Sequence, residues 1–500
     1  MYTRCLRPNY RILLYRTPVR NAQQSGKPPA PPPDAKASAT APPAASAAKA
    51  KAGPTSTRKE KLPPPEGIIT NTKKEFGRLH DCDRIFQNLY GRHDWRLKGA
   101  CQRGDWYRTA DLIEMGPDWI MTQVKKSGLR GRGGAGFYVG HKWEYLRSTE
   151  AKGKVLVMNC AEGEPGTCKD REIIRHEPHK LIEGLVLAGY TMGCERAVIY
   201  VRNKFYNEAC NLQFAIAEAY KYGLLGSNAC DTGWKFDINV QRGDRYICGE
   251  ETALINCLEG KMGRPRRRPP YLSEKGLFGH PSLVINAESI AVLPTLLRRG
   301  PGWFACLGRS YNSGTKLFNI SGHVNQPCTV EEEMSIPLRQ LIECHAGGVR
   351  GGWDNLLAVF PGGLSTPLIN KQTADDVSMD YDCLESKGSS LGSGAVIVMN
   401  KQCDPLMTML RAITFYKQHT CKQCTPCREG SIWLPEIFKR FNTGEAQPEE
   451  VDWLPTILKT MEGTTICALS DSQVNVTRSM ITNFREVIMK RIETYCKGGE

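Results

Sequence analysis

Short, unbroken apolar runs alternate with longer amphipathic stretches over the first half of the chain. Val155–Met158 and Ala197–Val201 are runs of this kind, and segments so short and uniformly apolar are typical of strands buried on both faces. Helix-like stretches lie between such runs, and Ala110–Lys126 is predicted to be helical. The alternation predicts an α/β domain with a mainly parallel sheet over residues 67–310.

The pattern changes near residue 311. Pro337–Ala346 is predicted to be a helix with its proline near the first turn. Four segments around it are predicted to be strands: Lys316–Ile320, Thr329–Met334, Leu356–Phe360 and Ala395–Met399. One helix and about four strands predict a compact α+β domain over residues 311–403.

Beyond residue 404 the sequence is amphipathic with a helical period. Breaks rich in Gly, Pro or Cys separate the segments Met407–Tyr416, Ile432–Phe441, Val451–Met461 and Asn475–Tyr495. Helices of this kind bury their apolar faces against one another. Residues 404–500 are therefore predicted to form a small helical bundle.

The first 66 residues differ from the rest in composition. The first 33 hold six Arg or Lys and no acid, which is typical of a mitochondrial presequence and predicts one over residues 1–35. Residues 36–66 are rich in Pro, Ala, Ser and Lys. Such a segment cannot bury enough apolar surface to offset the conformational entropy lost on folding, so it is predicted to be a disordered linker. A flexible cytosolic tail is the alternative to an import signal.

Charge and hydropathy argue against two other classes of protein. The formal net charge is +15, but residues 1–66 carry +9 of it and the other 434 residues only +6. This ordinary surface balance removes most of the support for nucleic-acid binding. The sequence contains no run of about 18 apolar residues, so no membrane span is predicted.

The strongest chemical signal lies in CKQCTPCREG, residues 421–430. Cys421, Cys424 and Cys427 fall within seven positions, and the next cysteine, Cys467, completes the spacing C-x2-C-x2-C-x39-C. Structural zinc usually takes two separated pairs of ligands, whereas three ligands on one loop with a distant fourth favour an iron–sulfur cluster. The spacing therefore favours [4Fe–4S] and electron transfer, with zinc and buried core cysteines as the alternatives.

Three further motifs lie in the predicted α/β domain. GLRGRGGAGF, residues 128–137, matches G-x-G-x-x-G but follows a predicted helix, so it lacks the strand–turn–helix context of a dinucleotide fingerprint. Its backbone N–H groups can still cradle a phosphate, and a mobile surface loop is the alternative. NCAEGEPGTCKDRE, residues 159–172, and YICGEETAL, residues 246–254, place paired acids after apolar strands, where α/β proteins bind ligands.

In this order, GRGGAGF, NxxEGEPGTCKDRE, YICGEETAL, SGHV and CxxCTPCREG make residues 70–495 resemble the NADH-binding flavoprotein subunit of respiratory complex I. The resemblance implies a Rossmann-like FMN and NADH domain, a β-grasp domain of the soluble-ligand-binding type and a helical [4Fe–4S] domain. It implies hydride transfer from NADH to FMN and passage of single electrons to the cluster and on toward ubiquinone.

The same resemblance implies partners and a location. The partners are other complex I subunits, chiefly the [2Fe–2S] flavoprotein-fraction subunit and the large iron–sulfur subunit. The location is the matrix side of the mitochondrial inner membrane.

Ligand contacts are also implied by the resemblance, residue by residue. The FMN contacts are Gly131, Gly133, Gly134, Ala135, Lys142, Asn159, Glu162, Tyr246, Gly249, Glu250 and Asn286. The NADH contacts are Phe137, Tyr145, Glu164, Glu251, Arg268 and Tyr271. The cluster ligands are Cys421, Cys424, Cys427 and Cys467.

The chain departs from the usual family pattern near these residues. NADEGEPG becomes NCAEGEPG, which places Ala161 where an acid is usual, and RGAGAYICGEE becomes RGDRYICGEE, which shortens the turn Arg242–Tyr246 by one residue. Losing a carboxylate beside the flavin predicts bound FMN with reduced NADH oxidation. The alternative is a structural paralogue that keeps the fold and cluster but oxidises little or no NADH.

Overall fold

The computed structural model describes residues 63–498. The predicted presequence, residues 1–35, and the part of the predicted linker up to residue 62 lie outside the described residues. Over residues 63–498, no helix combines the length and the apolar character that crossing a bilayer requires.

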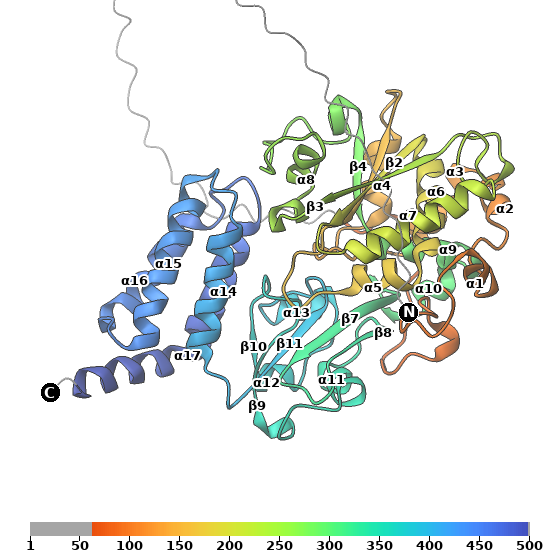
Figure 1. Ribbon diagram of the computed structural model, residues 1–500. Coiled ribbons are helices and arrows are strands. Elements are labelled where there is room, and N and C mark those ends of the chain that lie inside the picture. The colour runs from red at the N-terminus through yellow and green to blue at the C-terminus, as the bar shows by residue number, and fades with distance from the viewer. Residues whose placement is uncertain (1–62, 499–500) are drawn as a thin grey trace, which may run out of the picture. The chain divides into compact units, whose positions relative to one another are not determined.

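Four parallel strands form the first sheet, in the order β3–β2–β1–β4 (Figure 1). They are β1 (Val155–Cys160), β2 (Arg196–Arg202), β3 (Asp237–Gly243) and β4 (Ser282–Asn286). β1 lies between two neighbours and is apolar and buried over its first four residues, as a central parallel strand requires. The predicted strands and the parallel sheet are confirmed.

Ten helices accompany this sheet among the described residues. They are α1 (Leu97–Gln102), α2 (Thr109–Glu114), α3 (Pro117–Lys126), α4 (Val139–Arg147), α5 (Lys169–His176), α6 (Pro178–Met192), α7 (Tyr206–Lys221), α8 (Glu251–Leu258), α9 (Ala287–Arg299) and α10 (Pro301–Ala305). α6 is buried almost all round and packs against α9. It ends at Gly193, whose φ of 70° gives the left-handed C-cap that glycine adopts without strain.

The helix predicted over Ala110–Lys126 is wrong in one respect, because the structure has two helices there. α2 ends at Glu114, and Gly116 has a φ of 87° that no helix contains. Pro117 then starts α3 at its first position, where its missing N–H leaves no hydrogen bond unmade. Gly116 and Pro117 therefore separate the two helices.

The middle region forms a second, mixed sheet of five strands in the order β10–β9–β11–β7–β8. Its strands are β7 (Thr315–Gly322), β8 (Cys328–Glu333), β9 (Leu356–Phe360), β10 (Ile369–Asn370) and β11 (Ala395–Asn400). A small hairpin of β5 (Gly308–Arg309) and β6 (Asn312–Ser313) precedes them. The four predicted strands are confirmed, and β10 was missed because two residues carry no periodic signal.

Three helices accompany the second sheet: α11 (Leu338–Ala346), α12 (Lys371–Ala374) and α13 (Tyr381–Ser386). α11 confirms the predicted helix, with Pro337 as its N-cap. The prediction of a single helix in this region is wrong, since α12 and α13 are also present. They were missed because each spans only one to two turns. Asn370 and Asp380 cap them by accepting hydrogen bonds from backbone N–H groups.

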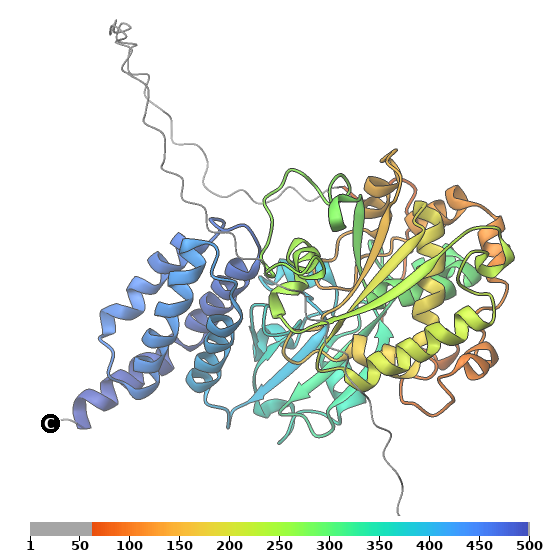
Figure 2. The same ribbon diagram turned by 45° about the horizontal axis from the view of Figure 1, so that its top comes forward.

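The four predicted C-terminal helices are confirmed and are longer than predicted. α14 (Pro405–His419), α15 (Thr425–Thr443), α16 (Pro448–Met461) and α17 (Leu469–Gly498) lie side by side as a bundle in Figures 1 and 2. Asp404 caps α14 by accepting from the N–H groups of Leu406 and Met407. This cap falls just before the first of the predicted amphipathic segments.

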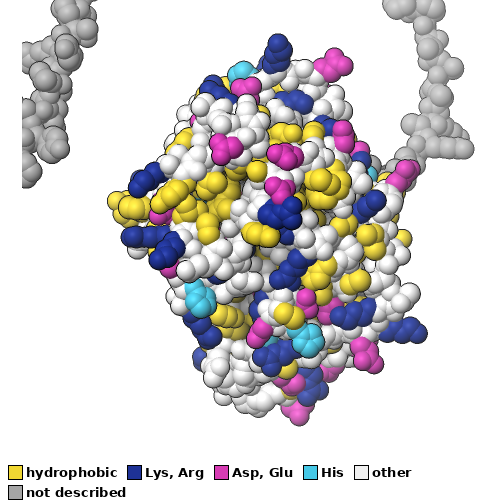
Figure 3. Space-filling view, turned by 90° about the vertical axis from the view of Figure 1, so that its right-hand side faces the viewer, with side chains coloured by type: hydrophobic (Ala, Val, Ile, Leu, Met, Phe, Trp, Pro, Cys, Tyr) yellow, Lys and Arg dark blue, Asp and Glu magenta, His cyan; other side chains and the backbone are white. Residues whose placement is uncertain are grey.

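The face of the molecule drawn in Figure 3 carries Lys and Arg side chains intermixed with Asp and Glu. Neither sign covers a large area of that face. Charges of both signs side by side are typical of an ordinary solvated surface.

Candidate functional site

The glycine loop of residues 128–137 joins α3 to α4 and folds back on itself. The N–H of Gly131 donates to the Phe137 oxygen at 2.7 Å, and Arg130 forms an isolated bridge with Tyr138. A Cβ on Gly136, whose φ is 65°, would lie 2.5 Å from the ring of Tyr381. The loop is thus anchored rather than free, and it follows helix α3, as its sequence context predicted.

Side chains alternate along this loop between the interior and the surface. Arg132 is fully buried, where its N–H donates to Ser289 Oγ and its guanidinium to the Ser313 oxygen, both at 2.8 Å. Gly133, Ala135 and Phe137 are exposed. A buried anchor with small exposed neighbours leaves backbone open to a flat or phosphorylated ligand.

Asn159 and Asn286 lie at the carboxyl edge of the parallel sheet. They are direct partners in the register of β1 and β4. The Asn159 amide donates to the backbone oxygens of Cys248 and Gly249, at 3.3 and 3.4 Å. The turn before α8 therefore meets the ends of β1 and β4 at the edge where α/β proteins bind ligands.

The two acids after β1 have different surroundings. Glu162 is buried and accepts hydrogen bonds from the N–H groups of Asp170 and Arg171, at 2.8 and 2.9 Å, so it caps α5. Glu164 accepts from the Tyr246 hydroxyl and from the Ser365 N–H, both at 2.7 Å. Burial raises the pKa of Glu164, and these two bonds oppose that rise.

A second group of charges lies at the start of α8. Lys142 Nζ contacts Glu251 Oε2 at 2.8 Å and donates to the Val284 oxygen at 2.6 Å. Arg268 bridges Glu250 at 3.1 Å and Glu251 at 2.7 Å. Burial acts to raise the pKa of Glu251, but Lys142 and Arg268 outweigh it and lower the pKa, so this carboxylate is held ionised.

Three aromatic residues of the predicted NADH contacts are exposed. The exposed fractions are 38% for Phe137, 50% for Tyr145 and 53% for Tyr271. When a flat ligand stacks on an exposed aromatic ring, apolar surface is removed from water, which stabilises the complex. Their exposure fits a stacking role.

The four predicted cluster cysteines come together at one end of the helical bundle. Cys421 lies on the loop before α15, Cys424 is the N-cap of α15, Cys427 lies in its first turn, and Cys467 precedes α17. Cys427 Sγ lies 3.2 Å from the Thr420 hydroxyl, and Cys424 Sγ accepts from the Ile466 N–H at 3.4 Å. All four are free thiols packed in one apolar group with Ile247 and Tyr416.

This donor set fits a [4Fe–4S] cluster. Burial raises the pKa of Cys427 and raises that of Cys467 to about 12, so a positively charged centre is needed to hold them as thiolates. Over residues 63–498, no group of three or more His, Cys, Asp or Glu is arranged to hold a single metal ion. Each thiolate of a cubane binds its own iron, and such ligands lie farther apart than those of one zinc ion.

Aromatic side chains connect the two groups of predicted residues. The ring of Tyr246 lies edge-on to Phe415, with centroids 4.9 Å apart, and 5.9 Å from the ring of His419. Phe415 and His419 belong to the end of α14, which leads directly into the cysteine loop. The turn that holds Glu164 therefore packs against the helix that delivers Cys421.

Sequence reasoning missed several residues that shape this site. Lys169 and Asp170 are buried against Asn286, and their place in the motif NCAEGEPGTCKDRE, residues 159–172, was a usable signal. Gly363 and Ser365 reach Glu164 from the β9–β10 loop. No local pattern could have found that contact, because about 200 residues separate its partners.

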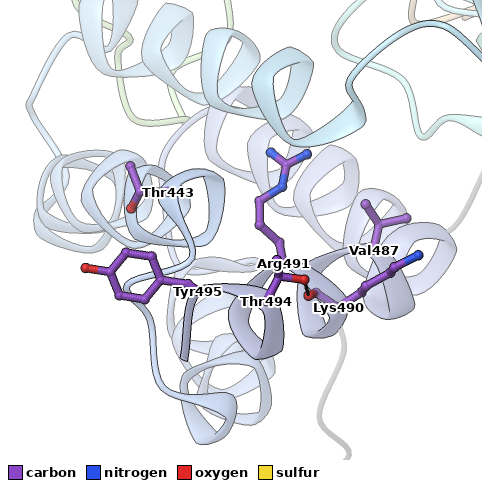
Figure 4. A pocket seen from close by; sticks show the side chains of 6 residues that line it. All are labelled: Thr443, Val487, Lys490, Arg491, Thr494 and Tyr495. Carbon is purple, nitrogen blue, oxygen red and sulfur yellow. Dashed lines mark hydrogen bonds between the residues drawn. The ribbon is translucent and has the colours of Figure 1, made fainter. Parts of the chain in front are cut away.

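A surface pocket of about 450 Å³ lies elsewhere, lined by Thr443 of α15 and five residues of α17 (Figure 4). None of the predicted ligand contacts lines it. Its Arg491 already bonds Asp404 and Asn442. The pocket therefore adds nothing to the site built at the sheet edge.

Three family models match successive segments of the chain. The Nuo51 FMN-binding domain matches residues 124–295, the SLBB domain matches residues 316–398, and the NADH-ubiquinone oxidoreductase-F iron-sulfur binding region matches residues 407–491. Fold, donor set and matches together define a flavin- and iron–sulfur-carrying oxidoreductase subunit.

Proteins that are similar over most of the chain identify the family within this class. "NADH dehydrogenase [ubiquinone] flavoprotein 1, mitochondrial" of Dictyostelium discoideum is 56% identical, over 84% of this chain and 89% of its own length. An NADH-quinone oxidoreductase subunit of Rickettsia bellii is 52% identical, over 82% of this chain and 99% of its own length. The chain belongs to the family of complex I flavoprotein subunits that these two proteins represent.

Among solved structures, the NAD+-reducing [NiFe]-hydrogenase in its H2-reduced state is similar. A chain of it matches with a TM-score of 0.69 and 30% identity, over 77% of this chain and 64% of that one. The resemblance inferred from the motifs, the fold class and the cofactor classes FMN and [4Fe–4S] are thereby confirmed. The individual ligand contacts and the domain limits stay predictions.

Proposed function

We propose that this chain is the subunit through which a mitochondrial complex I takes electrons from NADH on the matrix side of the inner membrane. The observation that carries the proposal is the meeting of two groups of residues. Glu164 and Glu251 lie at the carboxyl edge of the parallel sheet, and the turn between β3 and α8 packs in the same apolar group as Cys427. A nucleotide bound at that edge would lie beside the cysteine loop.

Roles for the residues follow from their surroundings. The glycine loop, Asn159 and Asn286 form the proposed cradle for FMN, with Gly133 and Gly249 leaving backbone open. When bound, FMN accepts a hydride and gives up electrons singly, which the [4Fe–4S] cluster carries onward. Glu164, fixed by Tyr246 and Ser365, is placed to accept a hydrogen bond from an amide or hydroxyl of NADH.

The remaining predicted residues have roles in charge neutralisation, stacking and cluster binding. Lys142 and Arg268 neutralise Glu250 and Glu251, so the nucleotide phosphates do not meet two uncompensated carboxylates. Phe137, Tyr145 and Tyr271 offer exposed rings for stacking. Cys421, Cys424, Cys427 and Cys467 would hold the cluster.

The partners we propose are the [2Fe–2S] flavoprotein-fraction subunit and the large iron–sulfur subunit. An electron that reaches the cluster needs a further acceptor, and the residues described contain no second group of clustered cysteines. The chain "NADH dehydrogenase [ubiquinone] flavoprotein 1, mitochondrial", to which this one is similar, supports the mitochondrial assignment.

The test is to purify the assembled enzyme and measure FMN content, the cluster spectrum and NADH:ferricyanide activity. We expect stoichiometric FMN and activity in the wild type, and a KM for NADH about tenfold higher in Glu164→Gln, because a charge-assisted hydrogen bond contributes about 1.5–3 kcal/mol. Glu493→Gln, on the exposed face of α17, is the matched control. An enzyme with the cluster but without flavin or NADH oxidation would instead be the structural paralogue.

A further inference from the structure

Asn286, the last residue of β4, has its side-chain amide held on both sides by buried residues. Its oxygen accepts from Lys169 Nζ at 3.0 Å and from the Glu288 N–H at 3.1 Å. Its nitrogen donates to Asp170 Oδ2 at 2.7 Å and, at 3.4 Å, to the Asn159 oxygen. The long contact to Asn159 is the weakest of the four, so that N–H is the part of the amide left for a ligand.

Two charges decide which way this amide faces. Turning it by 180° would bring its NH2 group against the Lys169 ammonium and its oxygen against the Asp170 carboxylate, and both contacts would become repulsive. Lys169 and Asp170 are themselves paired at 2.7 Å and are buried. Burial acts to lower the pKa of Lys169, but Asp170 and Glu288 outweigh it and raise the pKa, so Lys169 stays charged.

The glycine loop rests on the same residue. A Cβ placed on Gly133 would lie 3.2 Å from the Cβ of Asn286, which is tighter than ordinary van der Waals contact, so the Gly133 backbone lies directly against Asn286. Lys169 Nζ also lies 3.0 Å from Glu288 Oε2, and the Glu288 Oε1 atom accepts from the Leu317 N–H of β7 at 2.8 Å. A displacement of Lys169 would therefore change the packing of Asn286, and through it the glycine loop, and the contact of Glu288 with the second sheet.

We propose that Lys169 and Asp170 are positioning residues for the flavin: they hold the Asn286 amide in one orientation, so that binding FMN does not have to order it. The inference rests on the proposed function, in which Asn286 belongs to the FMN cradle. If the Asn286 amide were free to turn, its ordering on binding would reduce the binding free energy of FMN. An amide already held in one orientation avoids this cost. Lys169 and Asp170 act through Asn286 and do not themselves touch FMN.

The experiment measures FMN release from the assembled enzyme by flavin fluorescence, together with its melting temperature and cluster spectrum. Lys169→Met removes the cation, and Asp170→Asn keeps the size of the side chain while leaving Lys169 paired with Glu288. Each is made in the wild type and in Asn286→Ala. Lys316→Met is the matched control, because Lys316 is equally buried and lies 3.6 Å from Glu288 Oε2, and its Nζ has no hydrogen-bond partner among the described residues.

We expect Lys169→Met and Asp170→Asn each to raise the Kd for FMN about tenfold in the wild type, and less than about twofold when Asn286 is already Ala. Lys316→Met should change the melting temperature without changing the Kd. Equal effects in both backgrounds, or an equal rise in Kd in Lys316→Met, would overturn the inference. If Lys169→Met does not fold, Asp170→Asn decides alone. A wild type without flavin would count against the proposed function rather than against this pair.

Discussion

The hydroxyl of Tyr246 donates a 2.7 Å hydrogen bond to Glu164. Glu164 follows β1, and Tyr246 follows β3, so the bond joins two strand ends of the parallel sheet. The second partner of Glu164, the Ser365 N–H, comes from the β9–β10 loop of the second sheet. One carboxylate proposed to meet NADH is thus placed by two domains at once.

Gly363 allows this contact and provides the first prediction. It has a φ of 105°, and a Cβ there would lie 2.7 Å from Glu164 Oε1. We expect Gly363→Ala to displace the carboxylate and raise the KM for NADH about tenfold, with a smaller change in kcat, because a binding contact is lost.

Gly348→Ala is the control for that variant. Gly348 has a similar φ of 81°, but nothing lies within 4 Å of its added Cβ. Steady-state kinetics on both variants separate backbone strain from the clash with Glu164. The same rise in KM in both would mean that the contact with Glu164 has no role in binding.

Cys467→Ser should remove or strongly weaken the [4Fe–4S] cluster, because serine is a poor ligand for an iron–sulfur centre and the other three cysteines cannot complete four thiolates. Visible absorbance and the EPR signal of the reduced enzyme report the result. Cys210→Ser, at an exposed cysteine of α7, should leave both unchanged. An unaltered cluster in Cys467→Ser would show that the fourth ligand lies elsewhere.

Ala161→Asp should increase NADH oxidation about tenfold or more, with FMN bound in both forms. A carboxylate in this loop can accept a hydrogen bond worth about 1.5–3 kcal/mol, and 1.4 kcal/mol is about tenfold in rate. Ala161 is 5% exposed, so Ala161→Asn controls for the added volume. No gain, with a wild-type rate already comparable to that of relatives, would make Ala161 a neutral exchange.

A chain that starts near residue 67 should fold and bind FMN. A chain that starts near residue 73 should be less stable, because Asn71 donates to the Ala305 and Gly308 oxygens at 2.5 and 2.9 Å and Ile69 donates to the Lys126 oxygen. Melting temperature and FMN content of the two truncations test this difference. Failure of the longer chain would place the domain boundary before residue 67.

Lys316 should make stability depend on pH. Burial lowers its pKa to about 7, although Glu288 acts to raise it and Lys169 and Arg132 lower it further. Between about pH 7 and 10.4 the unfolded lysine binds a proton that the folded one lacks, so stability rises with pH across that window by up to about 1.4 kcal/mol per unit. Lys316→Met should flatten the slope, as measured by denaturation at pH 7 and 9. The exposed Lys204→Met should not.

The grouping of the four cysteines, the longer strands of the second sheet and the helices of the C-terminal bundle could be predicted from the sequence. Cys421, Cys424 and Cys427 are close in the chain, so their spacing reports their chemistry directly. Segments with one period predicted β1, β2, the longer strands of the second sheet and the four C-terminal helices, whereas α6, α7 and α9 were not predicted individually. The two-residue β10 and the break at Gly116 were missed, since neither carries a pattern long enough to count.

What the sequence determined by itself is local: which segments form helices and strands, where glycine frees the backbone, and which thiols belong together. Only the tertiary structure decided that Lys169 and Asp170 orient Asn286, and that Ser365 reaches Glu164. A periodic pattern shows that a residue is buried but not which residue it meets. The buried charges of Lys169, Asp170 and Glu288 are stable only as a paired group, and that group is complete only once α5, which carries Lys169 and Asp170, has come together with α9, which carries Glu288.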